Sequence, residues 1–276
     1  MAKHPKISII TVSYNCRKCI EKTIKSVIGL SYNNLEYIII DGDSTDGTVD
    51  IIEQYKDKID YFVSERDKGI YDAMNKGLAV ATGEWVNFMN AGDFFANKDV
   101  LNGIVEQIED EAVVVYGNMI KQCNGYYYLA TPAGTKKTDT RMPVFHQSTF
   151  VKLSYHHSHP FDISFKSSGD YNFFFNAFFR DKCKFQYIPI IVACFDNIGG
   201  MSKDNHSLSI RENLRIWKKE HDFIFKINME KELFIHDIKM WFKNYFLNAN
   251  QRRILELRRL RRLGNEYQLG NYEELI

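Results

Sequence analysis

The chain begins its first recognisable element at residues 6–15, with the stretch KISIITVSYN. Most of this stretch is an unbroken run of β-branched and other apolar residues, and the run stops at Tyr14 and Asn15. A short apolar run that ends in this way is typical of a buried strand. The segment 16–30 that follows has apolar residues at helical spacing, and Asn15 can cap such a helix. The stretch therefore predicts a strand that leads directly into a helix.

The same alternation of strand and helix continues to residue 118. Further strands are predicted at 35–42, 59–65, 84–90 and 112–118, and further helices at 48–55, 69–81 and 100–108. Strands that alternate with helices in this way predict an α/β fold with a mostly parallel, Rossmann-like sheet flanked by helices. In such sheets ligands bind beyond the carboxyl ends of the strands.

Polar side chains follow four consecutive predicted strands at that edge: Tyr14 and Asn15, Asp41 and Asp43, Glu65 to Asp67, and Asn90 and Asp93. Because parallel strands end at one edge of a sheet, we expect these side chains to line a common cleft. The Gly-rich motifs of dinucleotide and P-loop sites are absent from the sequence. An acid-rich edge repels phosphate, so a phosphate-containing ligand would need a divalent cation held by one or two carboxylates.

The composition fits a large apolar core and argues against a nucleic-acid partner. The 276 residues are 45% hydrophobic, and 36 basic residues balance 35 acidic ones, so no strong field attracts a polyanion. No apolar run is long enough for a membrane span, and the first residues lack the apolar segment of a signal peptide. Cys16 and Cys19 form a C-x-x-C, but a zinc site would need a second pair. We expect a cytoplasmic protein.

Four motifs in the same order are similar to those of the family 2 inverting glycosyltransferases: ISIITVSYN, IIIDGDSTDGT, DKGIYDAMNKGLAVATGEW and FMNAGD. The resemblance covers roughly residues 5–205 and is closest to bacterial enzymes that build surface polysaccharides such as colanic acid, capsule and O-antigen. It implies a GT-A fold over 1–206, with a nucleotide-sugar half at about 1–120 and an acceptor half at about 121–206. A helical, aromatic and basic extension is expected at 207–276.

The resemblance also implies which residues bind the donor, a nucleotide-diphospho-sugar and most specifically a UDP-sugar. Tyr14 and Asp41 should border the base, with Asp41 accepting a hydrogen bond from N3–H of uracil. Asp67, Asn75 and Lys76 should line the donor pocket.

The stretch FMNAGD, residues 88–93, stands where the family carries an aspartate-rich metal motif of the form D-x-D-D. Asn90 and Gly92 replace two of its acids, and Asp93 is retained. The resemblance implies that Asp93 holds a magnesium or manganese ion bridging the donor diphosphate, with Asn90 beside it. A single carboxylate with phosphate oxygens and water can hold magnesium. The reduced motif also leaves open a second interpretation, a catalytically silent nucleotide-sugar-binding subunit of a polysaccharide assembly complex.

Asp170 stands just ahead of an aromatic helix, where an acid in this family is the general base of an inverting transfer to an acceptor hydroxyl. The residues alone also allow Asp170 to be a helix N-cap, and Asp162 is the alternative base. His146 is expected to be a hydrogen-bonded histidine that lies in the core or supports the ligating residues, with direct contact to the diphosphate or metal as the alternative. The loop 197–206 resembles a segment that closes over the diphosphate, or else is a plain surface loop.

The extension ends in QRRILELRRLRRLG at 251–264, which carries six arginines. Three interpretations stay open: a helix packed on the catalytic domain, a helix that lies on the anionic inner face of the plasma membrane, or a contact in a homo-oligomer. The second would place the enzyme peripherally, beside a glycan acceptor linked to polyprenyl diphosphate. The last residues, from 265, are expected to fray.

Overall fold

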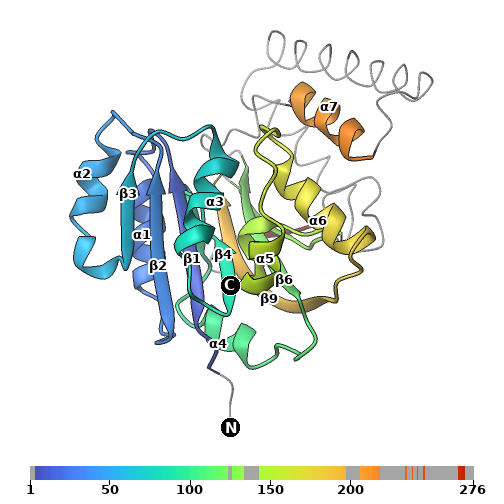
Figure 1. The fold of residues 1–276 in the computed structure, drawn as a ribbon, viewed down its shortest axis with the longest axis horizontal. Coiled ribbons are helices and arrows are strands. Elements are labelled where there is room, and N and C mark those ends of the chain that lie inside the picture. The colour runs from blue at the N-terminus through green and yellow to red at the C-terminus, as the bar shows by residue number, and fades with distance from the viewer. Residues whose placement is uncertain are drawn as a thin grey trace.

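The computed structural model describes residues 4–123, 126–133, 143–196, 206–217 and 267–270, together with Phe234, Ile238, Trp241 and Tyr245. Its elements in chain order are β1 (Ile7–Ser13), α1 (Ile20–Ile28), β2 (Leu35–Asp41), α2 (Thr48–Glu53), η1 (Lys56–Lys58), β3 (Tyr61–Ser64), α3 (Ile70–Val80), β4 (Trp85–Phe88), β5 (Asp93–Phe95), α4 (Val100–Val105), β6 (Val114–Cys123), β7 (Tyr126–Ala130), η3 (His146–Ser148), β8 (Thr149–Lys152), α5 (Leu153–Ser158), α6 (Gly169–Phe179), β9 (Phe185–Asp196), α7 (His206–Ile216) and β10 (Tyr267–Gly270) (Figure 1). The predicted loop at 197–205 and the arginine-rich segment at 251–264 lie outside these residues.

The described strands form one sheet with the order β10-β7-β6-β8-β4-β1-β2-β3, and β9 pairs with β5 and β6. The first half is confirmed as parallel, because β3, β2, β1 and β4 all run the same way. Beyond β4 most pairings are antiparallel, with β6 and β9 the parallel exception. The sheet is therefore mixed rather than mostly parallel. The βαβ alternation stops after β6, and antiparallel neighbours do not need a helical crossover.

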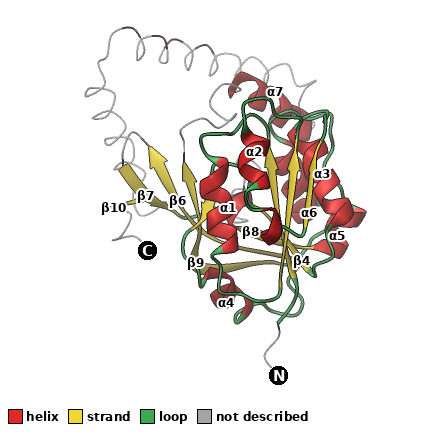
Figure 2. Cartoon of the chain, turned by 90° about the vertical axis from the view of Figure 1, so that its left-hand side faces the viewer, coloured by secondary structure: helices red, strands yellow, loops and turns green. Residues whose placement is uncertain are grey.

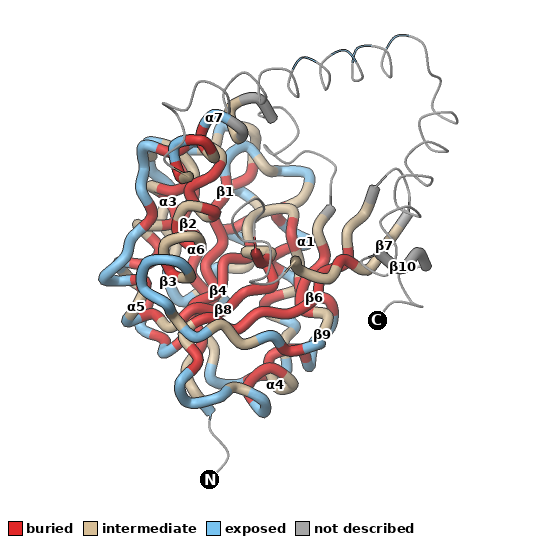
Figure 3. Tube along the Cα trace, turned by 90° about the vertical axis from the view of Figure 1, so that its right-hand side faces the viewer, coloured by how far each residue is buried: buried red, intermediate tan, exposed pale blue. Residues whose placement is uncertain are grey.

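The sheet separates two apolar cores (Figure 2). Helices α1, α2 and α4 cover one face, and α3, α5 and α6 cover the other. In β1, Ile7 and Ile9 belong to the first core, whereas Ile10 and Val12 belong to the second. Because alternate side chains of a strand point to opposite faces, strands that are covered on both sides read as continuous apolar runs. The central strands are accordingly buried along their length (Figure 3).

The first helix starts later than the sequence predicts. α1 begins at Ile20, after a turn in which the Cys16 carbonyl accepts from the backbone N–H groups of Cys19 and Ile20. Asn15 has a φ of 50° and its Oδ1 accepts a hydrogen bond from the Thr45 N–H at 2.9 Å. The prediction that Asn15 caps the helix is wrong, because this side chain joins the two loops at the sheet edge instead.

The predicted extension is partly integrated into the fold. α7 packs on the main body through Leu214 and Ile216, which are both buried. The segment 267–270 forms β10 and pairs with β7, so the extension is not helical throughout and these residues do not fray. Backbone pairing across the sheet, which local composition does not reveal, explains the difference. None of the helices in the described part of the chain is long and apolar enough to span a membrane.

Candidate active site

The carboxyl ends of the parallel strands meet at one edge, as predicted. The strand register places Ser13 of β1 beside Asp41 of β2, and Asp41 beside Ser64 of β3. β4 pairs with β1 and leads into the Asn90–Asp93 loop, whose Ala91 N–H donates to the Val12 carbonyl at 3.1 Å. The loops after all four strands therefore lie around the same edge.

Asp41 is fully buried at this edge, and its carboxylate already accepts four hydrogen bonds. Oδ1 accepts from the hydroxyls of Ser13 (2.8 Å) and Ser44 (2.6 Å). Oδ2 accepts from the Ser44 N–H (2.8 Å) and the Ser64 hydroxyl (2.7 Å). A carboxylate offers about four acceptor positions, so a hydrogen bond from a nucleotide base would have to replace one of these. Asp41 therefore joins the ends of β1, β2 and β3 through these hydrogen bonds. Its contact with the nucleotide base stays a prediction.

Tyr14 and Asp67 converge above the backbone of Gly42. A Cβ at Gly42 would lie 2.5 Å from Asp67 Oδ2 and 3.3 Å from the Tyr14 ring, so a side chain at this position would displace the Asp67 carboxylate. The Tyr14 side chain is 65% exposed, while Asp67 Oδ1 accepts from the Gly69 N–H at 2.7 Å. An exposed ring suits stacking on a planar base, and a nearby carboxylate suits hydrogen bonds from base or sugar donors.

Asn75 and Lys76 are engaged inside the protein. The Asn75 amide donates to the Phe161 carbonyl and accepts from the Phe161 N–H, both at 2.9 Å. Lys76 Nζ donates to the Arg66 carbonyl at 2.8 Å and pairs with Glu65 at 2.7 Å. Asn75 therefore ties α3 to the second half of the chain, and Lys76 holds the β3–α3 loop. That they line the donor pocket stays a prediction.

The Asn90–Asp93 loop is held in a tight turn against α1. Gly92 has a φ of +103°, a conformation that favours glycine, and its N–H donates to Thr23 Oγ1 at 3.0 Å. Thr23 Oγ1 in turn donates to the Asp93 carbonyl at 2.7 Å. Asp93 opens β5 and is 6% exposed. Asn90 Nδ2 lies 3.4 Å from His146 Nε2, and Asn90 Oδ1 is buried with no hydrogen-bond partner.

His146 connects this loop to Asp170. His146 Nδ1 lies 3.2 Å from Asp170 Oδ2 on one side, and its Nε2 faces Asn90 on the other. Burial lowers the pKa of His146, but the hydrogen bond and charge of Asp170, with the charge of Asp93, more than offset this and raise it. The histidine predicted to lie in the core therefore sits between the metal-motif loop and the expected base.

Asp170 is contacted by two side chains, one of which is held by a third, and it still reaches solvent. Besides His146, the Tyr71 hydroxyl donates to Asp170 Oδ1 at 3.2 Å, and Trp217 Nε1 donates to the Tyr71 hydroxyl at 2.8 Å. The Asp170 side chain is 21% exposed. It lies inside the first turn of α6, where the N-cap position belongs to Ser168. Asp170 is therefore not the N-cap residue, although its Oδ1 accepts from the Tyr171 N–H in the first turn of α6 at 2.8 Å. Its role as the general base stays a prediction.

Asp162, the alternative base, faces α7 instead. Its carboxylate accepts from the Ser164 N–H at 2.9 Å and pairs with Arg215 at 3.2 Å. Burial raises the pKa of Asp162, but these hydrogen bonds and the Arg215 charge bring it below its usual value. A carboxylate held ionised by a cation is a weak base, so the geometry favours Asp170.

Glu212 of α7 holds the loop that leads into α6. Its carboxylate accepts from three consecutive backbone N–H groups, those of Lys166 (2.7 Å), Ser167 (3.0 Å) and Ser168 (2.8 Å). Carboxylates that accept backbone N–H bonds form strong, charge-assisted contacts. The sequence analysis missed Glu212, and also Tyr71 and Trp217. Tyr71 lies in the DKGIYDAMN motif, which is a signal, but nothing local marks the other two.

Replacing Glu212 with glutamine is expected to destabilise the fold by about 1–3 kcal/mol, because one of the three buried backbone donors then faces an amide donor. Thermal unfolding should show the loss, and Glu106→Gln, a change of an exposed glutamate directly after α4, is the matched control. Turnover should fall together with stability, because the loop held by Glu212 leads into α6, which carries Asp170. Equal melting temperatures for the two variants would contradict the role of Glu212.

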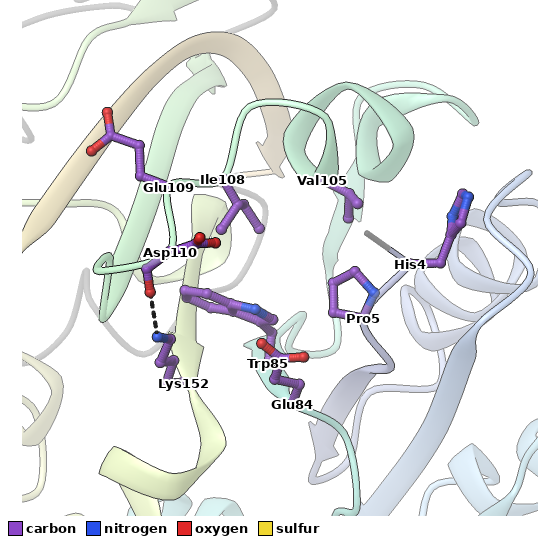
Figure 4. Close-up of a pocket in the computed structure, with 9 residues that line it drawn as sticks. All are labelled: His4, Pro5, Glu84, Trp85, Val105, Ile108, Glu109, Asp110 and Lys152. Atoms are coloured by element: carbon purple, nitrogen blue, oxygen red, sulfur yellow. Dashed lines mark hydrogen bonds between the residues drawn. The ribbon is translucent and has the colours of Figure 1, made fainter. Parts of the chain in front are cut away.

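A pocket of about 360 Å³ lies elsewhere (Figure 4). Its lining includes His4, Trp85, Val105 and Lys152, at the start of β4 and the end of α4. In Figure 1, α4 and the N-terminus lie at the lower end of the molecule and α7 at the upper end. The pocket is therefore at the amino edge of the parallel strands, away from Asp93, His146 and Asp170.

A divalent cation fits the Asn90–Asp93 loop. Asp93 supplies a carboxylate, and the unpartnered Oδ1 of Asn90 supplies a second oxygen from the same turn. Magnesium and manganese favour such oxygen ligands. Within the described ranges no group of three or more His, Cys, Asp or Glu side chains forms a metal site. The loop therefore suits a cation that is shared with a ligand's phosphate oxygens and water.

Comparison with known proteins adds a family match. Residues 8–181 match the family model described as glycosyl transferase family 2. A "PGL/p-HBAD biosynthesis glycosyltransferase" of Mycobacterium bovis is 26% identical over 207 residues, which cover 72% of this chain and 79% of the relative. The "putative teichuronic acid biosynthesis glycosyltransferase TuaG" of Bacillus subtilis is 42% identical over 92 residues, 32% of this chain and 36% of TuaG.

Among solved structures, residues 1–349 of S. aureus TarS in complex with UDP-GlcNAc superpose with a TM-score of 0.61 at 20% identity. The match covers 76% of this chain and 64% of that one. A longer solved chain of S. aureus TarS is matched over 39% of its length. At this identity the likeness establishes the fold, a mixed α/β sheet flanked by helices.

Proposed function

The chain belongs to glycosyl transferase family 2, and on that basis we propose that it transfers a sugar from a UDP-sugar to a hydroxyl of a glycan acceptor, with inversion at the anomeric carbon. One observation carries the proposal: Asn90, His146 and Asp170 form a continuous chain of contacts. These contacts connect the Asn90–Asp93 loop, which would face the diphosphate, with the Asp170 carboxylate, which would act as the base. The TarS complex with UDP-GlcNAc supports a UDP-linked donor.

The donor would lie along the edge that runs from Tyr14 to Asp93. The exposed Tyr14 ring and the Asp67 carboxylate would take the nucleoside, above Gly42. Asp93 and Asn90 Oδ1 would hold a magnesium or manganese ion that neutralises the diphosphate and its developing charge. His146 lies beside the same loop, where its Nε2 would accept from Asn90 Nδ2 and so leave Asn90 Oδ1 for the cation.

Asp170 would carry the proton transfer. Its carboxylate removes the proton of the acceptor hydroxyl while that oxygen attacks the anomeric carbon from the side opposite the diphosphate. The bond to the leaving nucleoside diphosphate breaks in the same displacement, so the configuration inverts. Tyr71 and His146 fix the two carboxylate oxygens, which keeps the base in the attacking geometry.

The acceptor is proposed to be a growing, lipid-linked glycan of a bacterial surface polysaccharide. The name of TuaG, which refers to teichuronic acid biosynthesis, supports a polysaccharide product, and the name of the mycobacterial relative refers to PGL/p-HBAD biosynthesis. The region that would meet the acceptor is bounded by α6 and α7, because Asp170 and Trp217 lie there.

The direct test is an assay of purified full-length protein with a set of UDP-sugars, with and without Mn²⁺. We expect a rise in melting temperature with one or a few donors, since a ligand that binds only the folded state stabilises it. We also expect transfer to a glycan acceptor or slow donor hydrolysis. Donor binding without either reaction on any acceptor would favour the silent subunit, and no binding of any nucleotide sugar would overturn the proposal.

The arginine-rich segment at 251–264 is proposed to hold the enzyme on an anionic membrane surface. Each arginine near such a surface contributes about 1 kcal/mol. Changing its six arginines to glutamine should therefore abolish co-sedimentation with anionic vesicles, and high salt should weaken wild-type binding. Substitution is preferable to truncation, because a deletion would also remove β10.

The matched control for this test changes Lys56 and Lys58, which are exposed cations on η1. Transfer to a lipid-linked acceptor should fall in the arginine variant, whereas transfer to a short water-soluble acceptor should not. Equal sedimentation of the wild type and the arginine variant would contradict the proposed membrane binding. It would favour a segment that packs on the catalytic domain or forms a contact in an oligomer.

A further inference from the structure

Two cysteines stand at the ends of the turn that precedes α1. The Cys19 N–H donates to the Cys16 carbonyl at 2.9 Å, and the Cys19 thiol also lies 3.5 Å from that oxygen. A four-residue turn of this kind brings its end Cα atoms within about 7 Å. Disulfides span Cα distances of about 4.4–6.8 Å. The backbone therefore already holds the two thiols at a spacing that a disulfide can bridge.

The pair also has the chemistry of a reactive thiol. Both side chains are partly exposed. The hydrogen bond from the Cys19 side chain lowers the pKa of Cys16 to about 7, although burial and the charges of Asp46 and Asp41 oppose this. Thiolates are the nucleophiles of thiol–disulfide exchange, so Cys16 is reactive near neutral pH. Cys183 contrasts with it, because burial raises the pKa of that thiol.

The turn lies between two parts of the candidate active site. Tyr14 is two positions before Cys16, and the Cys16 thiol donates to the Tyr14 carbonyl at 3.2 Å. On the other side, Cys19 Sγ would be only 3.7 Å from a Cβ placed on Gly92. The turn is therefore in contact with the Tyr14 backbone on one side and lies beside the Asn90–Asp93 loop on the other.

We propose that Cys16 and Cys19 form a redox-active pair, and that their oxidation to a disulfide weakens nucleotide-sugar binding at the adjacent edge. Forming the bond brings the sulfurs to about 2.05 Å with a dihedral near 90°. The Cys16 thiol then loses its hydrogen bond to the Tyr14 carbonyl, and Cys19 Sγ shifts against Gly92. The second part of the proposal rests on the proposed function, and the first does not.

The oxidant is a low-molecular-weight disulfide, such as glutathione disulfide. The Cys16 thiolate attacks one of its sulfurs, forms a mixed disulfide and releases one thiolate. Cys19 loses its proton, attacks Cys16 Sγ and releases the second thiolate. Two protein thiols are oxidised and one small disulfide is reduced to two thiols. Reduction by an excess of small thiol runs through the same steps in reverse.

The first experiment needs no activity. Full-length protein is equilibrated in glutathione buffers of graded potential, then alkylated and digested, and the peptide containing residues 16–19 is examined by mass spectrometry. We expect a loss of two hydrogens in that peptide, which reverses in reducing buffer. Cys16→Ser and Cys19→Ser should each abolish the change, while Cys183→Ser should not affect it. Alkylation of both thiols at every potential would overturn the proposal.

The second experiment measures binding of a UDP-sugar to the reduced and oxidised forms of the same preparation. We expect oxidation to lower the affinity at least about tenfold, a difference that is easily resolved. The Cys19→Ser variant should bind as the reduced wild type does, in both buffers. Equal affinity of the two wild-type forms would overturn the proposed control of binding. If the reduced protein binds no nucleotide sugar, the proposed function fails, while the disulfide result stands independently.

Discussion

Replacing Asp170 with asparagine is expected to lower turnover by about 10²–10⁴-fold, the usual contribution of a general base, while donor affinity stays nearly unchanged. The amide has the same shape and can still meet Tyr71 and His146, but it cannot take up the proton of the acceptor hydroxyl. In the proposed arrangement Asp170 meets the acceptor, whereas the Asn90–Asp93 loop and Tyr14 bind the donor, so the donor should keep its own contacts. Initial rates with saturating donor, and donor titrations by calorimetry, separate the two effects.

The matched control is Asp162→Asn. This carboxylate lies in the same segment but pairs with Arg215, and its side chain is 43% exposed. We expect it to change turnover by less than about threefold, because a partly exposed ion pair contributes little to stability. Normal turnover in Asp170→Asn together with a lower melting temperature would mean that Asp170 is structural. A large loss of turnover in Asp162→Asn alone would instead identify that residue as the base.

Replacing Asp93 with alanine is expected to abolish cation-dependent donor binding and, with it, transfer. Asp93 is the one acid retained in the Asn90–Asp93 turn, so the variant leaves only the Asn90 oxygen for the cation. The turn itself should persist, because Thr23 holds it through the backbone of Gly92 and Asp93. Donor titrations at several Mn²⁺ concentrations measure the effect, and circular dichroism checks the fold.

Asp57→Ala serves as the control for Asp93, because it removes an exposed aspartate on η1. The comparison corrects for the general effect of removing one negative charge. Near-normal turnover of Asp93→Ala with an unchanged response to Mn²⁺ would show that the cation, if used, is held elsewhere.

The sequence alone determined the parallel half of the sheet and the edge at which the site lies. Both follow from local signals: apolar runs that fit strands covered on both faces, helical periodicity between them, and polar residues at the strand ends. Tyr14, Asp67, Asn90 and Asp93 could be placed at that edge because each lies a few residues beyond the carboxyl end of β1, β3 or β4, and position along the chain then fixes position in the sheet.

Only the tertiary structure decided how the second half completes the site. Tyr71 and Asp170 are 99 positions apart, Asn90 and His146 are 56 apart, and Glu212 reaches back 44 positions to Ser168. Local periodicity carries no information about such pairs, because they depend on how β8, α6 and α7 pack on the sheet. The same limit explains Asp41: its position at the end of β2 could be predicted, but two of the three serines that donate to its carboxylate, Ser13 and Ser64, come from the neighbouring strands β1 and β3. A residue's type and spacing therefore indicate what chemistry it can do, whereas its partners, which decide whether it does that chemistry, are set by contacts between distant segments.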